Sequence, residues 1–375
     1  MTLLDSSVVV TGRERRSFLA LSRELARNFY WTLRRETPDS RTRDIRSRGI
    51  RHIVKLPFRL PVTFMRFSSR LRADPRPKLA IVLLERMGDI VAAEPLARLA
   101  RARFPGVRIC WITTPPYAVL PANFPAVDDV LVVHCMTEWM FLSRMKFFDT
   151  IWNLHCTEAC CPHCGIRHMN PPGMPSLQTY YEFGNLLVVQ CINAGLPRLT
   201  DAPVLTPPAD AVAAVSALRL PVRFLVIHCT ASDGTRDWPA DKWQELVTRL
   251  QAADPSLHVI EIGLDPLVIR QDGARQRSLC GRLSMLETAE VIRRASLFIG
   301  IDSGPAHLAN AVGTPGVIPL GAFGGFASYL PYSGGYATGA LADIVRTDGP
   351  ASEVSVAAVF DAALRRLGGR EMKTT

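Results

Sequence analysis

From Lys78 onward, short apolar runs alternate with amphipathic segments, and this alternation constrains the fold more than any other feature of the chain. The apolar runs predict strands at 79–84, 107–112, 130–133, 150–154, 224–228, 258–262, 297–301 and 317–320. Helices are predicted between them at 89–103, 240–252, 285–294 and 305–312. Strands that are apolar throughout belong to parallel sheets with helices on both faces. The pattern therefore predicts an α/β fold.

A Pro-rich stretch at 203–208 divides this alternation into two series. We predict two Rossmann-like domains, 78–205 and 206–375, preceded by an extension at 1–77. Ligands bind such folds outside the carboxyl ends of the parallel strands. A ligand cleft is therefore expected between the two domains.

The extension carries most of the positive charge. Residues 1–78 contain 19 Lys and Arg against 7 Asp and Glu, while the whole chain has a net charge of +10. Spacing of apolar residues predicts an amphipathic helix at 13–36, residues 41–51 have the composition of a linker, and 53–71 mix apolar with basic residues. Two interpretations stay open: adsorption to an anionic membrane surface, or helices packed on the body with a solvated basic face. No motif supports nucleic-acid binding.

The sequence predicts a cytoplasmic location. No apolar run reaches the roughly 18 residues that span a bilayer, and Met1–Val10 lacks the basic start of a signal peptide. The nine cysteines are then expected to be reduced or metal-bound rather than paired as disulfides.

The first predicted strand ends in Leu84–Ile90, which has no GxGxxG and so excludes a dinucleotide fingerprint at this turn. Asp89 stands where the next helix begins. It could be a helix N-cap, or a general base that takes a proton from an acceptor hydroxyl.

Two turns of the second series could bind phosphate. In Phe298–His307, Asp302 or Ser303 would cap a helix, Pro305 suits its first turn, and Gly304 lets a ligand approach the backbone. Free N–H groups at such a helix start attract anions. The loop 228–239 contains Arg236, which could hold a phosphate bidentately. A capped helix and a plain surface loop are the alternatives.

Together these segments resemble the heptosyltransferase family, glycosyltransferase family 9. The resemblance spans roughly 79–345 and rests on several motifs: 83–90, the helix 95–103 with Phe104-Pro105, 123–128, 148–154, 236–239, 300–309, and the late loop from Gly321 to Gly334. It implies the GT-B architecture, in which two Rossmann-like domains with parallel sheets face a central cleft.

The resemblance also implies roles for single residues. Asp89 corresponds to the general base, and Arg236 stands near the donor phosphates where members usually have Lys. Asp302, Ser303, Gly304 and His307 would lie at the donor diphosphate and sugar, and Asp265 would bind the ribose. The implied reaction is an inverting transfer of heptose from a nucleotide sugar such as ADP-heptose to a glycan or glycolipid acceptor, lipopolysaccharide core for example, without a catalytic cation.

Other functions stay open on the sequence alone. The same fold could use another nucleotide sugar or a protein acceptor. It could also be a catalytically silent, membrane-associated binding or assembly protein.

The segment 155–164 departs from the family because it contains Cys156, Cys160, Cys161 and Cys164. Cys161-x-x-Cys164 has the spacing that lets two thiolates share a metal. Cys156 or Cys160, with a histidine, could complete a structural zinc or iron site. The alternative is a set of reduced thiols. The other five cysteines lie in apolar segments and are expected to be core residues.

Overall fold

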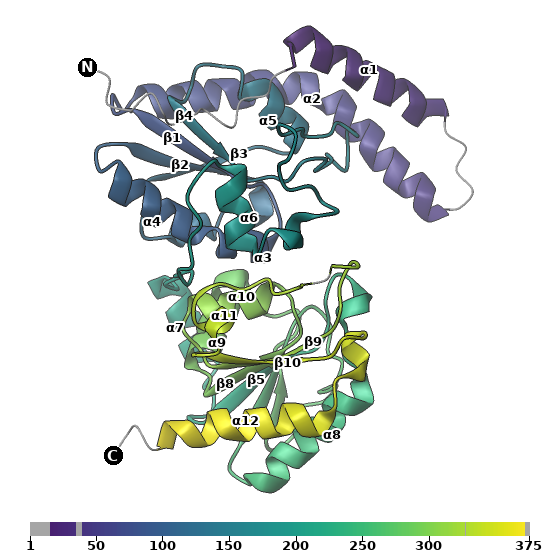
Figure 1. Cartoon of the computed structure of the whole chain (residues 1–375), viewed down its shortest axis with the longest axis vertical. Helices are drawn as coiled ribbons and strands as arrows, with labels where there is room; N and C mark the ends of the chain where they lie inside the picture. The colour runs from purple at the N-terminus through teal and green to yellow at the C-terminus, as the bar shows by residue number, and fades with distance from the viewer. Residues whose placement is uncertain (1–15, 35–39, 327, 372–375) are drawn as a thin grey trace.

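The computed structural model describes residues 16–34, 40–326 and 328–371, and Figure 1 shows them as two α/β domains preceded by two helices. The predicted ends 13–15 and 35–36 of the first helix and the segment Met1–Val10 lie outside the described residues.

The first domain is built on a four-stranded parallel sheet of order β3-β2-β1-β4. Its strands are β1 (Lys78–Val82), β2 (Arg108–Thr113), β3 (Asp129–Val132) and β4 (Thr150–Asn153). Its helices are α3 (Met87–Ala92), α4 (Glu94–Arg103), α5 (Met136–Leu142) and α6 (Leu186–Asn193). Alternate residues of β1 enter two separate cores, as Ile81 packs with α4 on one face and Ala80 with α5 on the other.

The second domain holds a six-stranded parallel sheet of order β10-β9-β8-β5-β6-β7. Its strands are β5 (Phe224–His228), β6 (His258–Ile262), β7 (Gln276–Ser278), β8 (Leu297–Gly300), β9 (Gly316–Leu320) and β10 (Ala342–Arg346). Its helices are α7 (Ala209–Ala217), α8 (Ala240–Ala253), α9 (Met285–Arg294), α10 (Gly304–Ala311), α11 (Gly334–Thr338) and α12 (Val356–Glu371). Helices α8 and α12 cover one face, where Trp243 and Val359 pack on Ile227 and Ile299.

The predicted α/β fold with two parallel-sheet domains is confirmed. All eight predicted strands are present, since each contains an apolar run, which is buried throughout except in β3, where alternate residues are half-buried. The helix predicted at 89–103 is two helices, because α3 ends at Ala92 and Pro95 lies in the first turn of α4. The exact residues that bound the domains, 77/78 and 205/206, stay a prediction.

The extension forms two helices, α1 (Phe18–Arg34) and α2 (Ser40–Arg72), which lie against the first domain (Figure 1). The predicted linker at 41–51 was wrong: it is the first third of α2. Arg is a good helix former, so a basic composition poor in apolar residues does not by itself interrupt a helix. One side of α2 is buried on α5, through Ile53, Leu56 and Phe67.

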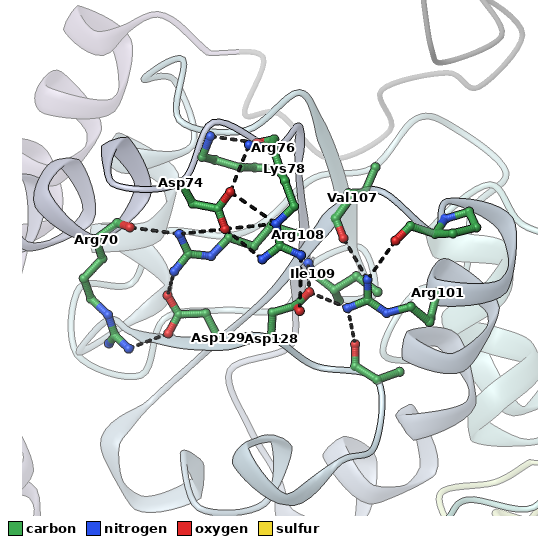
Figure 2. A network of polar contacts seen from close by, with 12 residues as sticks. Arg70, Asp74, Arg76, Lys78, Arg101, Val107, Arg108, Ile109, Asp128 and Asp129 are labelled. Carbon is green, nitrogen blue, oxygen red and sulfur yellow. Dashed lines mark hydrogen bonds and ion pairs between the residues drawn. The ribbon is translucent and has the colours of Figure 1, made fainter.

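A polar network fastens the end of α2 to the amino edge of the first sheet (Figure 2). Asp129, at the start of β3, binds the guanidinium groups of Arg70 in α2 and Arg108 in β2, the latter at 2.7 Å. Beside it, Asp128 accepts from the backbone N–H of Ile109 at 2.7 Å and pairs with Arg101. Asp129 is almost fully buried, and the positive charges of its two arginines offset the cost of burying its carboxylate.

Across residues 16–34, 40–326 and 328–371, none of the helices combines the length and the apolar character needed to pass through a bilayer.

Candidate active site

Asp89 is the third residue of α3, just beyond the carboxyl end of β1. The helix N-cap is Arg86, so the N-cap interpretation of Asp89 was wrong. Gln190 of α6 fixes the backbone at this position, because its Nε2 donates to the carbonyl oxygen of Asp89 at 2.9 Å. Burial raises the pKa of the Asp89 carboxyl to about 6, against the opposing charge of Arg86. The carboxyl group is thus poised to exchange a proton near neutral pH.

Helix α10 follows β8 and packs against α3, so the carboxyl edges of the two sheets face each other. The contact is tight: a Cβ on Gly88 would lie 2.7 Å from Cδ2 of His307, and a Cβ on Gly304 would lie 2.0 Å from Cε of Met87. Ser303 is the N-cap residue of α10, but its side chain does not cap the helix. Its Oγ lies 3.0 Å from Nδ1 of His228 instead. The first turn of α10 is therefore left without a side-chain acceptor.

A buried carboxylate organises the other side of the site. Asp302 accepts hydrogen bonds from the hydroxyl groups of Tyr329 and Tyr332, the second at 2.9 Å. It also pairs with Nη1 of Arg236 at 3.0 Å. The side chain of Asp302 is 4% exposed and that of Arg236 is 16% exposed, so the pair is largely shielded from solvent. These contacts hold the guanidinium in one place.

Arg236 retains unused donor capacity. Its Nε is buried and has no hydrogen-bond partner among the described residues. One face of the guanidinium lies over the ring of Phe323, 5.1 Å from the centroid. A planar cation with an unpaired buried donor is suited to an oxyanion ligand.

Two buried histidines flank this cluster, His228 at the end of β5 and His307 in α10. Burial lowers the pKa of each imidazole to about 4. Both are therefore neutral at pH 7, and His228 contributes its contact with Ser303 rather than a charge.

Aromatic residues from both domains close the site on one side. Tyr181, in the loop after β4, packs edge-on against Tyr329 at 4.8 Å and Phe326 at 5.2 Å. The neighbouring Tyr180 also contacts Phe326, at 5.1 Å. Proximity to the Asp89 and Asp302 charges adds to burial in raising the pKa of the Tyr181 phenol.

Six of the seven predicted site residues thus gather where α3 meets α10. Asp265 is exposed in the loop after β6, at the same carboxyl edge of the sheet. The carboxylate of Glu261 holds this loop by accepting from the backbone N–H groups of Leu267 and Ile269. A role for Asp265 in ribose binding stays a prediction.

The four cysteines predicted as metal ligands do not form one group. Cys161 and Cys164 are buried, whereas Cys160 is exposed and Cys156 lies beside Asn193, 3.6 Å from its Nδ2. The thiols of Cys161 and Cys164 meet that of Cys135 instead, far away in the sequence. The metal-ligating atoms of His52, Cys135 and Cys164 lie within 4.8 Å of one another.

Part of the chain is similar in sequence to known proteins. Residues 200–321 match the family described as glycosyltransferase family 9 (heptosyltransferase). The similarity to this family thus lies in the first part of the second domain. Lipopolysaccharide heptosyltransferase 3 of Escherichia coli K12 is 32% identical over 116 residues, which are 29% of this chain and 33% of that protein. The chain thus matches about a third of the length of this curated relative.

Solved structures share the fold over a longer stretch. A family 9 glycosyltransferase from Veillonella parvula superposes with a TM-score of 0.61 at 16% identity, covering 79% of this chain and 98% of that one. The ADP-heptose lipopolysaccharide heptosyltransferase II of E. coli gives 0.59 at 17% identity, covering 78% and 99%. The predicted GT-B architecture is therefore confirmed.

Several residues of the site were not predicted from the sequence. Tyr332 lies in the late loop that carried the family resemblance, so its position could have been flagged. His228 begins the loop 228–239, in which only Arg236 was assigned a role from the sequence. Tyr329 and Tyr181 gave no local signal, because only the fold brings their loops to Asp302.

Proposed function

We propose that this protein is an inverting glycosyltransferase that moves a heptose from ADP-heptose to a hydroxyl group of a lipopolysaccharide-type acceptor. The proposal rests on two groups from the two domains that meet at α3 and α10. One is the Asp89 carboxyl, whose pKa is raised, and the other is the buried guanidinium of Arg236, whose Nε has no hydrogen-bond partner among the described residues. The names of the curated relative and of the E. coli structure support the choice of sugar and acceptor.

In this scheme Asp89 removes the proton of the acceptor hydroxyl as its oxygen attacks the anomeric carbon, and the bond to the nucleoside diphosphate breaks on the opposite side. Arg236 and the uncapped start of α10 stabilise the negative charge that develops on the leaving diphosphate. Asp302 holds Arg236 in position. Protein groups thus take the role that a divalent cation has in other transferases.

The substitution Asp89→Asn tests the scheme because it removes the base and preserves the shape. We expect transfer from ADP-heptose to fall by at least about a hundredfold, while calorimetric binding of ADP-heptose stays unchanged. Asp361→Asn, at an exposed position of α12, is the matched control and should retain full activity. Unchanged transfer in Asp89→Asn would remove this residue from the mechanism.

Binding of the donor and transfer of the sugar can also be measured separately with the wild-type chain. Tight binding of ADP-heptose without transfer to any acceptor would favour a silent binding protein. Stronger binding of a nucleotide sugar other than ADP-heptose would redirect the donor assignment.

We further propose that the chain works at the cytoplasmic face of a membrane, held there by α2. An exposed apolar stripe follows one side of this helix at spacings of three and four residues: Val54, Phe58, Val62 and Met65. Phe58 is 76% exposed. A basic stripe runs beside it, formed by Arg51, Lys55, Arg59 and Arg66. This combination suits an anionic lipid surface.

Co-sedimentation with vesicles of mixed neutral and anionic lipid tests the membrane proposal. Each basic residue near the headgroups contributes about 1 kcal/mol, so replacing Lys55, Arg59 and Arg66 by Gln should weaken binding roughly a hundredfold. Arg365→Gln in α12 is the control, because this arginine is 66% exposed on the other domain. Equal binding of all forms, or binding to neutral vesicles alone, would contradict the proposal.

A further inference from the structure

Three segments far apart in the sequence bring sulfur and imidazole groups together beneath α2. Cys135 is the N-cap residue of α5, Cys161 and Cys164 lie in the loop after β4, and His52 lies in α2. The ligating atoms of His52, Cys135 and Cys164 are all within 4.8 Å of one another. The thiol of Cys161 lies beside those of Cys135 and Cys164, in the same buried cluster.

This spacing is close to what a tetrahedral metal needs. Zinc–sulfur bonds of about 2.3 Å place neighbouring sulfur ligands about 3.8 Å apart. The ligating atoms of His52, Cys135 and Cys164 therefore require shifts of only about an ångström to reach this spacing. Soft thiolates with one imidazole are the ligand set that selects zinc or iron over magnesium or calcium.

The loop backbone has the form of a metal knuckle. In Cys161-Pro162-His163-Cys164-Gly165 the chain reverses direction, with the N–H of Gly165 donating to the carbonyl of Cys161 at 2.9 Å. Gly165 has φ +65°, a conformation that glycine adopts without strain. The N–H of Cys164 points at the sulfur of Cys161. Backbone donors of this kind stabilise a thiolate and orient it toward a metal.

One buried polar atom at this place, Nε2 of His52, has no hydrogen-bond partner among the described residues. The hydroxyl group of Thr137 lies next to Cys161 and Cys164. Nδ1 of His52 is 3.4 Å from a guanidinium nitrogen of Arg59, too far for a strong hydrogen bond. A metal would satisfy the imidazole, and thiolate sulfurs would accept from the hydroxyl group.

We propose that His52, Cys135, Cys161 and Cys164 bind one structural zinc or iron ion, which clips α2 to the first domain. The ion joins the basic extension, the N-terminus of α5 and the loop after β4. It takes no part in the chemical step of sugar transfer, and Cys156 and Cys160 are not ligands. The proposal is independent of the proposed activity.

Elemental analysis of the purified full chain tests the ligand set. Wild type should contain about one zinc or iron per chain. Cys135→Ser and Cys164→Ser should reduce this content at least tenfold, and His52→Ala should make the metal easier to remove with a chelator. Cys160→Ser is the matched control, because it removes an exposed thiol next to the knuckle and should leave the metal content unchanged. Cys156→Ser should behave like the control.

A second measurement uses only the wild-type chain, in case the ligand variants fail to fold. Chelator treatment followed by addition of Co²⁺ should produce tetrahedral d–d bands and thiolate-to-cobalt charge-transfer absorption. Chelation should also increase proteolysis within α2. Three outcomes would overturn the proposal: no metal and no cobalt spectrum, metal loss in Cys156→Ser and Cys160→Ser but not in Cys135→Ser, or a Cys161–Cys164 disulfide in protein prepared under reducing conditions.

Discussion

Asp89→Asn should stabilise the fold at alkaline pH while it abolishes transfer. The pKa of the Asp89 carboxyl is raised by burial from 3.8 to about 6. The folded state therefore binds more protons than the unfolded state between these two pH values, so stability falls as the pH rises through that window. This loss of stability is absent below the pKa of Asp89 in the unfolded state and complete above its pKa in the folded state.

The magnitude follows from the shift. About two pKa units correspond to roughly 3 kcal/mol, and partial solvent access of the side chain reduces this to about 2 kcal/mol. Asparagine carries no charge and avoids the penalty. The variant should then unfold about 4–8 °C above wild type at about pH 8, and the difference should shrink at about pH 5.

Thermal unfolding of both proteins at these two pH values measures the effect, with Asp361→Asn as the exposed control that should show no difference. The pH dependence of kcat/KM gives a second view, because transfer should rise with pH through about 6 as Asp89 loses its proton. The reasoning fails if Asp89→Asn is no more stable than wild type at about pH 8, or if its advantage is the same at both pH values.

Other substitutions test the surrounding contacts. Arg236→Gln should weaken ADP-heptose binding at least about tenfold by calorimetry, and it should cost about 3 kcal/mol in chemical denaturation because Asp302 loses its buried cation. Tyr332→Phe should destabilise the second domain by about 1.5–3 kcal/mol, through loss of the 2.9 Å hydrogen bond to Asp302; an unchanged unfolding curve would contradict that contact. Gly88→Ala should lower both stability and transfer, because its Cβ would press on His307, and Gly106→Ala, where nothing lies within 4 Å, should do neither.

The fold was predictable where strands are buried on both faces. Such strands read as continuous apolar runs, so β5 and β6 were found with their bounds intact. The edge strands β7 and β10 were missed because they are mostly half-buried and contain polar residues. The helical start of α2 was missed for a related reason, since composition alone does not distinguish a basic helix from a basic linker.

The site was predictable only where its residues follow strands. Asp89 and Asp302 each stand just after a buried strand, and parallel sheets bring such positions to one edge. The cysteine group was misjudged because neighbours in sequence were assumed to be neighbours in space. Cys160 and Cys161 point to different surroundings, as adjacent residues of an extended segment do, while Cys135 comes from the start of α5.

The loop after β4 links the cysteine group to the active site, and this gives the metal proposal a consequence for kinetics. The loop begins at His155, whose Nε2 accepts from the backbone N–H of Leu84 just before the Asp89 turn. It passes through the knuckle and ends at Tyr181, which packs on Tyr329.

Arg236 and α10 belong to the other domain, and the loop meets their cluster at the contact of Tyr181 with Tyr329. The loop itself belongs to the first domain. Loss of the metal should therefore raise KM for the acceptor while the affinity for ADP-heptose stays within about twofold, a change of less than 0.5 kcal/mol. Steady-state kinetics of chelated and reconstituted protein would measure both. Equal loss of donor and acceptor affinity would mean that the loop supports the whole site rather than its acceptor side.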